Sequence, residues 1–463
     1  MSRILLVASE SAPFIKTGGL GEVIGSLPKA LKAQGEQVAV MIPDYIQIPE
    51  EYREKMTLIQ ELVTPLGWRQ QYVGLKKLVH EGITYYFVDN EQYFKRDWLY
   101  GQYDDGERFV FFCRAALTAL PYLDEFPDVI HCHDWQTAVI PLFLQSFYQD
   151  VEGYQDIKTV FTIHNLKFQG VFPRVVGTDL MNLPEDRLNN EGLEFYGKLN
   201  FMKAGIVYCD ALTTVSPTYA EEIKTPFYGE NLHGLIQKYE DKLSGILNGI
   251  DPPEKLVKTK AEYRNQLQER LGLPFNSKCP IISMIGRFTA QKGMDLIMRV
   301  IDEILLLDVQ MVMLGGGEAM YEWMLREVLW HNPSKLRVHT TYEQDLADLI
   351  YSASDIYLMP SLYEPCGIGQ MIAMQHGAAP VARETGGLKD TVAAYDPETG
   401  AGNGFLFSNF NAHELLYTVQ NAVSLYYDDP AAWARVVKQA EAADFSWADS
   451  AGRYKALYEQ LRG

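Results

Sequence analysis

The chain has 463 residues, of which 47% are hydrophobic and 22% charged, and this composition is ordinary for a globular protein of two or three domains. Its formal net charge of −19 repels nucleic acid and anionic membranes, so neither is an expected partner. The same field would repel a phosphorylated metabolite, so binding one requires a local cationic pocket in an acidic body.

The N-terminal residues and the cysteines indicate a cytoplasmic protein. The apolar run "ILLVAS" has six residues and acidic Glu10 follows it, so it predicts a first strand and not a signal peptide. No apolar run approaches the ~20 residues that span a bilayer. The five cysteines form no C-x-x-C pair and their number is odd, which favours reduced thiols over a disulfide framework.

Short β-branched runs alternate with longer amphipathic stretches along the first half of the chain. The predicted strands cover 3–9, 37–43, 84–89, 128–133, 158–164 and 211–216. Helical patterns lie between several of them, as at 20–35, where Gly35 stands at the expected C-terminal position, and at 135–149. Apolar strands separated by helices predict a parallel sheet that is buried on both faces.

The pattern breaks over 243–264, where Asn-Gly, Asp-Pro-Pro and a Lys/Glu-rich run predict a linker. It then restarts with predicted strands at 280–287, 309–318, 336–341, 354–361 and 379–384. An amphipathic helix is expected over the last residues, 444–463. The fold class is therefore α/β, with two doubly wound domains that we expect to face each other across a cleft. Ligands of such sheets bind beyond the carboxyl ends of the strands.

Three loops of the first domain carry candidate residues. "KTGGLGE" at 16–22 combines a lysine with glycines that let the backbone approach a ligand, although its spacing lacks the dinucleotide fingerprint and suits a plain turn equally well. In "HCHDWQ", His131 and His133 share one face of a strand, but without a third ligand we favour buried polar residues over a metal site. His164 follows another strand, where a structural role is the commoner one.

The loops of the second domain carry more candidate ligand-binding residues. "GRFTAQKG" places Arg287 and Lys292 at a strand end, which is the local cationic pocket that the net charge demands. The three glycines of "LGGGE" at 314–318 suit either a contact with a nucleotide phosphate or a plain turn between a strand and a helix. "PSLYEPCGIGQ" places Glu364 on a Pro-flanked loop before a helix, where it suits either a ligand contact or a helix cap. "RETGGLKDTV" offers the backbone N–H groups of two glycines to a phosphate or a sugar hydroxyl.

Seven motifs in one order resemble bacterial glycogen synthases and plant starch synthases: "KTGGL", "HDW", "HNLKFQG", "NGID", "GRFTAQKG", "PSLYEPCG" and "TGGLKDTV". The similarity runs from residue 3 to about residue 395, and the "DFSW" helix extends it to the C-terminus. The resemblance implies a GT-B glycosyltransferase with two Rossmann-like domains. It places an acceptor-side domain at 1–245, a nucleotide-sugar domain at 246–440, and a helix at 441–463 that packs back on the first domain.

The resemblance also implies roles for matching residues. On the donor side, Arg287 and Lys292 would grip the diphosphate, while Tyr342 would stack on adenine. Lys16, Gly18 and Gly19 would contact the diphosphate and sugar from the other domain. The glucose hydroxyls would be held by Glu364 with the backbone of Cys366 and Gly367.

The remaining implied roles concern the sugar and the acceptor. His164 would lie against the sugar, with its backbone carbonyl near the reacting carbon, and Asn165 belongs to the same substrate-binding loop. Asp134 would hold the acceptor or sugar side, and Asn248 would contact the glucosyl group. The N–H groups of Gly386 and Gly387 complete the predicted site. "YDDGERF" at 103–109 resembles a further acceptor-side motif.

The function that follows is glucosyl transfer from ADP-glucose to the non-reducing 4-OH of an α-1,4-glucan, with retention and with no metal or other cofactor. Cations at the diphosphate would stabilise the charge that develops on the leaving group, and the sugar would become oxocarbenium-like. Two alternatives remain open: a retaining enzyme that uses UDP-glucose or a small acceptor, and a weakly catalytic glucan-binding protein. The oligomeric state is not predicted.

Some positions depart from the family pattern. Glu22 stands where aspartate is frequent, Leu362 where arginine is frequent, and Ile372 where many retaining GT-B enzymes carry a second glutamate. Gln136 replaces a frequent histidine, and Pro252 and Pro253 stand where a longer loop is usual. These departures leave the predicted phosphate contacts intact and bear chiefly on acceptor preference.

Overall fold

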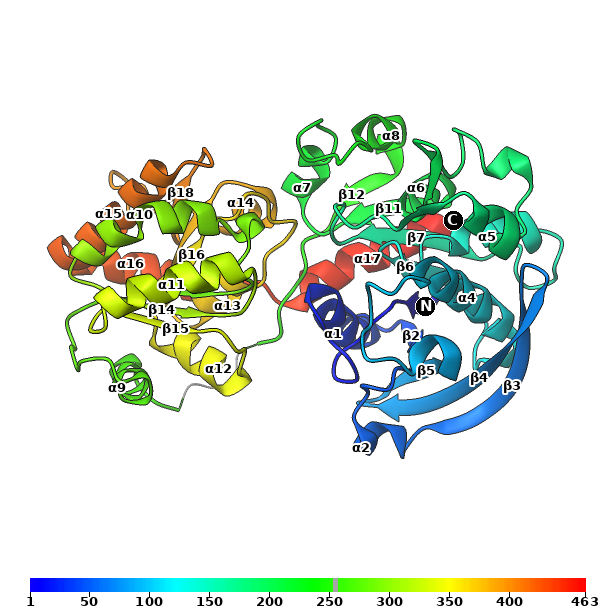
Figure 1. Cartoon of the computed structure of the whole chain (residues 1–463), viewed down its shortest axis with the longest axis horizontal. Coiled ribbons are helices and arrows are strands. Elements are labelled where there is room, and N and C mark those ends of the chain that lie inside the picture. The colour runs from blue at the N-terminus through cyan, green and yellow to red at the C-terminus, as the bar shows by residue number, and fades with distance from the viewer. Residues whose placement is uncertain (253–256) are drawn as a thin grey trace. The chain divides into compact units, whose positions relative to one another are not determined.

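The computed structural model describes residues 1–252 and 257–463, so the predicted loop position Pro253 lies outside the described residues. The described residues form two compact units, each with its own sheet (Figure 1). The N-unit comprises Met1–Gly249 together with Trp447–Gly463, and the C-unit comprises Ile250–Ser446. The two chain crossings therefore fall after Gly249 and after Ser446.

The N-unit is built on a nine-stranded sheet with the order β12-β11-β7-β6-β1-β2-β5-β4-β3. All neighbours from β12 to β5 pair in parallel, as the apolar strand pattern predicts. Its strands are β1 (Arg3–Val7), β2 (Gln37–Pro43), β3 (Thr57–Leu66), β4 (Arg69–His80), β5 (Ile83–Asp89), β6 (Val129–His133), β7 (Lys158–Ile163), β11 (Ala211–Thr214) and β12 (Leu243–Gly245). Its helices are α1 (Gly19–Ala33), α2 (Glu50–Arg53), α3 (Glu91–Phe94), α4 (Asp105–Ala119), α5 (Ile140–Phe147), α6 (Phe201–Tyr208), α7 (Pro217–Glu222), α8 (His233–Lys238) and α17 (Trp447–Arg462).

Several elements of the N-unit differ from the sequence prediction. The long antiparallel hairpin β3–β4 extends the sheet at one edge. The sequence analysis predicted no strand there. A small sheet is formed by β8 (Val171–Pro173), β9 (Glu194–Phe195) and β10 (Lys198–Asn200). Residues 243–264 are not all linker, because β12 and the start of α9 lie within them. Thr259 and Glu262 form a capping box there, which their three-residue spacing permits.

The C-unit contains a six-stranded, wholly parallel sheet with the order β15-β14-β13-β16-β17-β18. Its strands are β13 (Ile281–Ile285), β14 (Gln310–Leu314), β15 (Leu336–His339), β16 (Ile356–Met359), β17 (Ala379–Arg383) and β18 (Phe405–Phe407). Its helices are α9 (Lys260–Leu271), α10 (Met294–Leu306), α11 (Ala319–His331), α12 (Gln344–Ala353), α13 (Gly369–Gln375), α14 (Gly386–Thr391), α15 (Ala412–Asp428) and α16 (Pro430–Glu441).

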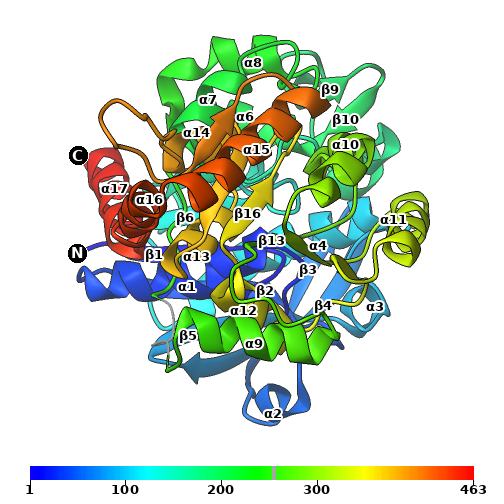
Figure 2. The ribbon, with the colours of Figure 1, turned by 90° about the vertical axis from the view of Figure 1, so that its left-hand side faces the viewer.

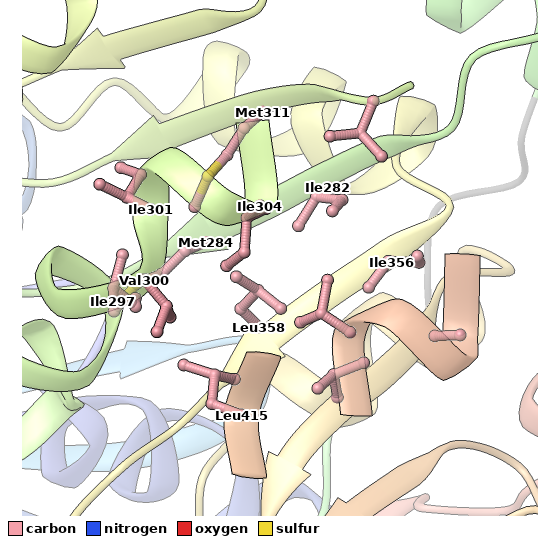
Figure 3. Packing of buried hydrophobic residues seen from close by; sticks show 14 of the residues in the cluster. Ile282, Met284, Ile297, Val300, Ile301, Ile304, Met311, Ile356, Leu358 and Leu415 are labelled. Atoms are coloured by element: carbon pink, nitrogen blue, oxygen red, sulfur yellow. The ribbon is translucent and has the colours of Figure 1, made fainter. Parts of the chain in front are cut away.

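Both faces of the C-unit sheet are covered by helices, because successive residues of each strand point to opposite faces. On one face, Ile282 and Met284 of β13 pack with Ile297 and Val300 of α10 and with Leu415 of α15 (Figure 3). On the other face, a second cluster contains Ile281 from β13 and residues of α9 and α12. Figure 2 shows α10 and α15 on one side of β13 and β16, with α12 and α9 on the other.

The parallel part of each sheet reverses its strand order at one point. In the N-unit the reversal lies between β1 and β6, and in the C-unit it lies between β13 and β16. Loops that leave adjacent strands at such a switch point run to opposite faces and leave a crevice for ligands. Each unit is therefore expected to bind its ligands at the loops after these strands: β1 and β6 in the N-unit, and β13 and β16 in the C-unit.

The C-terminal helix α17 belongs to the N-unit. Tyr454 and Tyr458 are buried on it, and Ser450 Oγ donates a hydrogen bond of 2.5 Å to the Leu247 carbonyl. Lys455 Nζ donates to the Gln34 carbonyl at the end of α1. Within 1–252 and 257–463, every helix is too short or too polar to cross a membrane.

Candidate active site

The loop after β13 carries the two predicted cations of the C-unit. Phe288 is fully buried and anchors the loop, while the Arg287 side chain beside it is exposed. A single 3-10 turn, Ala290–Lys292, then leads into α10. Gly293 closes that turn with φ +79°, and a Cβ there would lie 2.1 Å from the Pro360 carbonyl oxygen. Only glycine suits this position, and it lets the loop after β16 approach closely.

Lys292 and Glu364 are brought together by this approach. Lys292 Nζ lies 2.6 Å from Glu364 Oε2, and Ser361 Oγ donates to the same carboxylate oxygen at 2.9 Å. Glu364 is only 6% exposed, whereas the Lys292 side chain remains about one-fifth accessible, at 19%. A charge-assisted bond of this length holds both side chains at the switch point of the sheet.

The loop after β17 packs directly against the glutamate loop. The Gly387 N–H donates to the Glu364 carbonyl at 3.1 Å. Added Cβ atoms on Gly386 and Gly387 would lie 1.9 Å from the Glu364 carbonyl oxygen and 2.0 Å from the Cys366 carbonyl oxygen. These two glycines therefore allow two loops to touch, which is a structural use that the sequence pattern alone does not distinguish from ligand binding.

Two residues that the sequence analysis missed hold the glutamate loop. The buried Arg383 guanidinium donates to the carbonyls of Ser361, at 2.8 Å, and Leu362. The amide of fully buried Gln370 donates to the Gly367 carbonyl at 2.9 Å. Arg383 is 22 residues from Ser361, so no local motif marks its role, whereas Gln370 acts on a carbonyl only three residues away. The available signals were Arg383, at a strand end inside the "RETGGL" motif, and Gln370, the last residue of "PSLYEPCGIGQ".

Tyr342 lies apart from these residues, on the loop after the edge strand β15. Its ring is 55% exposed and its hydroxyl donates to Gln344 Oε1 at 2.9 Å. Strand β14 separates β15 from β13, so the ring lies to one side of the Lys292–Glu364 pair.

In the N-unit, the loop after β1 that carries Lys16 is organised by Glu10. The buried Glu10 carboxylate accepts hydrogen bonds from the Thr17 backbone N–H and from Thr17 Oγ1 and Tyr100 Oη, at 3.0 and 3.1 Å respectively. Burial raises the pKa of Glu10, although these bonds and one from the Gly18 amide oppose the rise. Sequence analysis assigned Glu10 no role, because Tyr100 is 90 residues away and Thr17, seven residues away, reaches the carboxylate only after the loop folds back.

The predicted residues of the Lys16 loop lie at the start of α1. Gly18 is extended and precedes the helix, whose first residue is Gly19. Lys16 Nζ lies 2.9 Å from Glu22 Oε1, and both side chains are about two-fifths exposed. Glutamate in place of the frequent aspartate therefore keeps a carboxylate within reach of the lysine.

Asp134 and the His164 loop are joined across the ends of β6 and β7. Asp134 has a left-handed φ of +57°, and its Oδ1 accepts the His164 backbone N–H at 2.8 Å. Burial raises the pKa of Asp134 to about 7, against the lowering effect of the His164 and Asn165 backbone amides. Asn165 Oδ1 accepts the Lys167 N–H at 3.1 Å, so its side chain shapes the same loop.

The three histidines of these loops form one cluster. His133 Nδ1 lies 3.0 Å from His164 Nε2, and the ring centroids of His131 and His133 are 4.1 Å apart. Two nitrogens that hydrogen-bond each other cannot both ligate one metal ion, so this third histidine does not complete a chelate. Burial lowers the pKa of His131 and of His164 to about 3, so both rings are neutral at pH 7.

Asn248 follows β12, which is four strands away from β1 in the sheet order. It is buried, and its Oδ1 has no hydrogen-bond partner within the described residues. The structure thus gathers Asp134, His164 and Asn165 in one place and Lys292, Glu364, Gly386 and Gly387, with their loop neighbours Cys366 and Gly367, in another.

Two doubly wound units, each with polar loops at its switch point, define the class of GT-B glycosyltransferases. The family described as "Starch synthase catalytic domain" matches residues 3–238, and "Glycosyl transferases group 1" matches residues 265–439. The chain is 52% identical over 462 residues to a glycogen synthase of Desulfitobacterium hafniense and 50% identical over 473 residues to one of Bacillus cereus, with 99% of each chain covered.

A solved structure agrees with these sequence relationships. The catalytic domain of starch synthase IV from Arabidopsis thaliana, bound to ADP and acarbose, superimposes with a TM-score of 0.93 at 32% identity, covering 100% of this chain and 99% of that one. The chain belongs to the glycogen and starch synthase family of glycosyltransferases. The resemblance found in the sequence motifs and the predicted fold class are both confirmed.

The buried histidines predict acid sensitivity. A pKa lowered on folding, from about 6.5 to about 3, gives stability that is complete above pH 6.5 and is lost as the pH falls, by up to about 1.4 kcal/mol per pH unit and histidine. In urea unfolding, the free energy of unfolding of His131→Asn should therefore fall by about 1 kcal/mol less than that of wild type between pH 6 and pH 5. His413→Asn, at an exposed position, should follow wild type. Equal pH slopes for His131→Asn and wild type would contradict the assignment.

Proposed function

We propose that this chain transfers glucose from ADP-glucose to the non-reducing 4-OH of an α-1,4-glucan, with retention of configuration. The observation that carries the proposal is the Lys292–Glu364 pair at the switch point of a parallel sheet. It supplies a cation and a carboxylate side by side, which a diphosphate leaving group and a developing oxocarbenium ion respectively require.

The donor diphosphate is bound by Arg287 and Lys292. The Arg287 side chain is exposed and makes no hydrogen bond or ion pair within the described residues, so its guanidinium is available for bidentate phosphate binding. Lys292 is partly accessible and contributes a point charge. Together they offset the charge that grows on the leaving phosphate, in a protein whose net charge of −19 would otherwise repel it.

Glu364 binds the glucosyl group of the donor. When a diphosphate competes for Lys292, the carboxylate is left with Ser361 and becomes free to accept a glucose hydroxyl. The N–H groups of Cys366 and Gly367 serve the remaining hydroxyls, and those of Gly386 and Gly387 support the same loop. The position eight residues after Glu364 is Ile372, which cannot act as a nucleophile. We therefore assign attack on the face from which the diphosphate departs, with no covalent intermediate.

Residues of the N-unit complete the reaction. His164 contacts the glucosyl group through its ring and its carbonyl, and Asp134 holds that loop by accepting the His164 N–H. Lys16, with Gly18 and Gly19, adds a cation and a flexible helix start for the diphosphate. Asn165 and Asn248 contact the sugar, and the unpartnered Oδ1 of Asn248 is a ready acceptor.

The exposed Tyr342 ring supplies a stacking surface for the adenine base. We also propose the cytoplasm as the compartment, because all five cysteines are buried and form no disulfide within the described residues, which suits reducing conditions.

The direct test is a matrix of donors and acceptors with the linkage of the product determined. ADP-glucose with glycogen should give the fastest nucleotide release and new α-1,4 linkages. UDP-glucose should be slower with the same acceptor. Preference for UDP-glucose would overturn the donor assignment, and glycogen binding without elongation would make the chain a glucan-binding protein.

Replacing Arg287 by alanine should separate catalysis from stability. Loss of one group that stabilises charge in the transition state typically lowers kcat by about 100-fold or more. The urea midpoint should not change, because the side chain makes no hydrogen bond or ion pair with the residues that the structure describes. Arg299→Ala is the matched control, since Arg299 is an exposed arginine on α10 of the same unit and its side chain is 62% accessible. Equal activities for the two variants would remove Arg287 from the site.

A further inference from the structure

Three histidine rings of the N-unit form a continuous row. His131 and His133 lie on one face of β6, with their rings 4.1 Å apart and tilted by 32°. His133 Nδ1 then meets Nε2 of His164 at 3.0 Å, at the end of β7. His131 and His133 are fully buried, while His164 is half-buried and is the member of the row that a substrate can reach.

The bond between His133 and His164 requires one donor and one acceptor. Burial lowers the pKa of all three rings, so each is neutral at pH 7 and carries a single ring hydrogen. If His133 Nδ1 were the acceptor, the hydrogen of that ring would sit on Nε2. That atom is buried and has no hydrogen-bond partner within the described residues.

A buried N–H without a partner is rarer in proteins than an acceptor that is left unused. His133 is therefore assigned as the donor through Nδ1–H, with a bare nitrogen at Nε2. His164 Nε2 must then be the acceptor, and the hydrogen of the His164 ring lies on Nδ1. No hydrogen bond from His164 Nδ1 occurs in the described part of the chain.

We propose that His133 is a positioning residue that fixes His164 as the Nδ1–H tautomer, so that His164 presents a hydrogen-bond donor to a sugar hydroxyl. The inference rests on the proposed function, in which the His164 ring lies against the glucosyl group. It extends that function by assigning roles to two fully buried side chains, His131 and His133, that do not reach the substrate.

The far end of the row is fixed by other elements. His131 Nδ1 lies 2.8 Å from the Tyr458 hydroxyl of α17, and His131 Nε2 lies 2.6 Å from Thr162 Oγ1. Both nitrogens of His131 are thus occupied, and its ring forms a fixed surface on which His133 stacks. The C-terminal helix, whose Tyr458 lies 327 residues beyond His131, therefore supports the side chain that sets the His164 tautomer.

The test compares His133→Asn with His133→Leu. The two replacement side chains have the same number and branching of heavy atoms, but only asparagine keeps an N–H donor near the place of Nδ1. Nitrogen-15 NMR of labelled histidines reads the tautomer in the ligand-free protein, and His164→Gln assigns the His164 signals. Wild type and His133→Asn should show His164 protonated at Nδ1, whereas His133→Leu should shift the hydrogen toward Nε2.

Kinetics supply the second readout. His133→Leu should lower kcat with ADP-glucose and glycogen about tenfold or more, while the KM for ADP-glucose changes little. His133→Asn should keep most of the wild-type kcat. Wild-type His164 protonated at Nε2 would overturn the proposal, and that measurement needs no variant to fold. Equal kcat values for the two variants would also overturn it. Because the tautomer is read without substrate, the NMR result would stand even if the enzyme used a sugar nucleotide other than ADP-glucose.

Discussion

The ion pair between Lys292 and Glu364 is the interaction on which the C-unit site depends. Its two members come from loops after β13 and β16, which are 72 residues apart in the chain, and they meet because Gly293 lets the loops touch. A buried carboxylate needs a cation or hydrogen bonds to remain charged, and Lys292 and Ser361 supply both. The pair thus holds both side chains in place before any substrate arrives, which is the preorganisation that electrostatic catalysis requires.

The two sheets explain why the chemistry lies where it does. The parallel part of each sheet has its strand order reversed once. Most loops with assigned roles follow strands at or beside that reversal: β1, β6 and β7 in one unit, and β13, β16 and β17 in the other, while Asn248 and Tyr342 follow the edge strands β12 and β15. In both units a buried side chain holds the backbone of a functional loop. Glu10 binds the Thr17 amide, Asp134 binds the His164 amide, and Arg383 binds the carbonyls before Glu364. Rigid strands and these anchors leave the substrate-binding groups little freedom to move.

Much of this arrangement could be predicted from the sequence, because parallel strands give apolar runs and the loops carry ordered motifs. The two doubly wound sheets and the residues Arg287, Lys292 and Glu364 follow from such local patterns. The β3–β4 hairpin was missed because its exposed faces lack a continuous apolar run. The roles of Arg383 and His133 were missed because their partners are 22 and 31 residues away, and that of Glu10 because its loop must fold back before Thr17 and Tyr100 reach the carboxylate. A tautomer depends on which nitrogen finds a partner in three dimensions.

The central claim is that Lys292 binds the diphosphate while Glu364 serves the sugar, and ADP binding tests it most directly. Calorimetric titration with ADP, which lacks the sugar, should show at least about tenfold weaker binding for Lys292→Ala, as expected for the loss of a charge-assisted bond. Glu364→Gln should bind ADP as tightly as wild type or more tightly, since a competing negative charge is removed, yet it should transfer glucose far more slowly. Equal losses of ADP affinity in the two variants would contradict this division of roles and make the pair a purely structural contact.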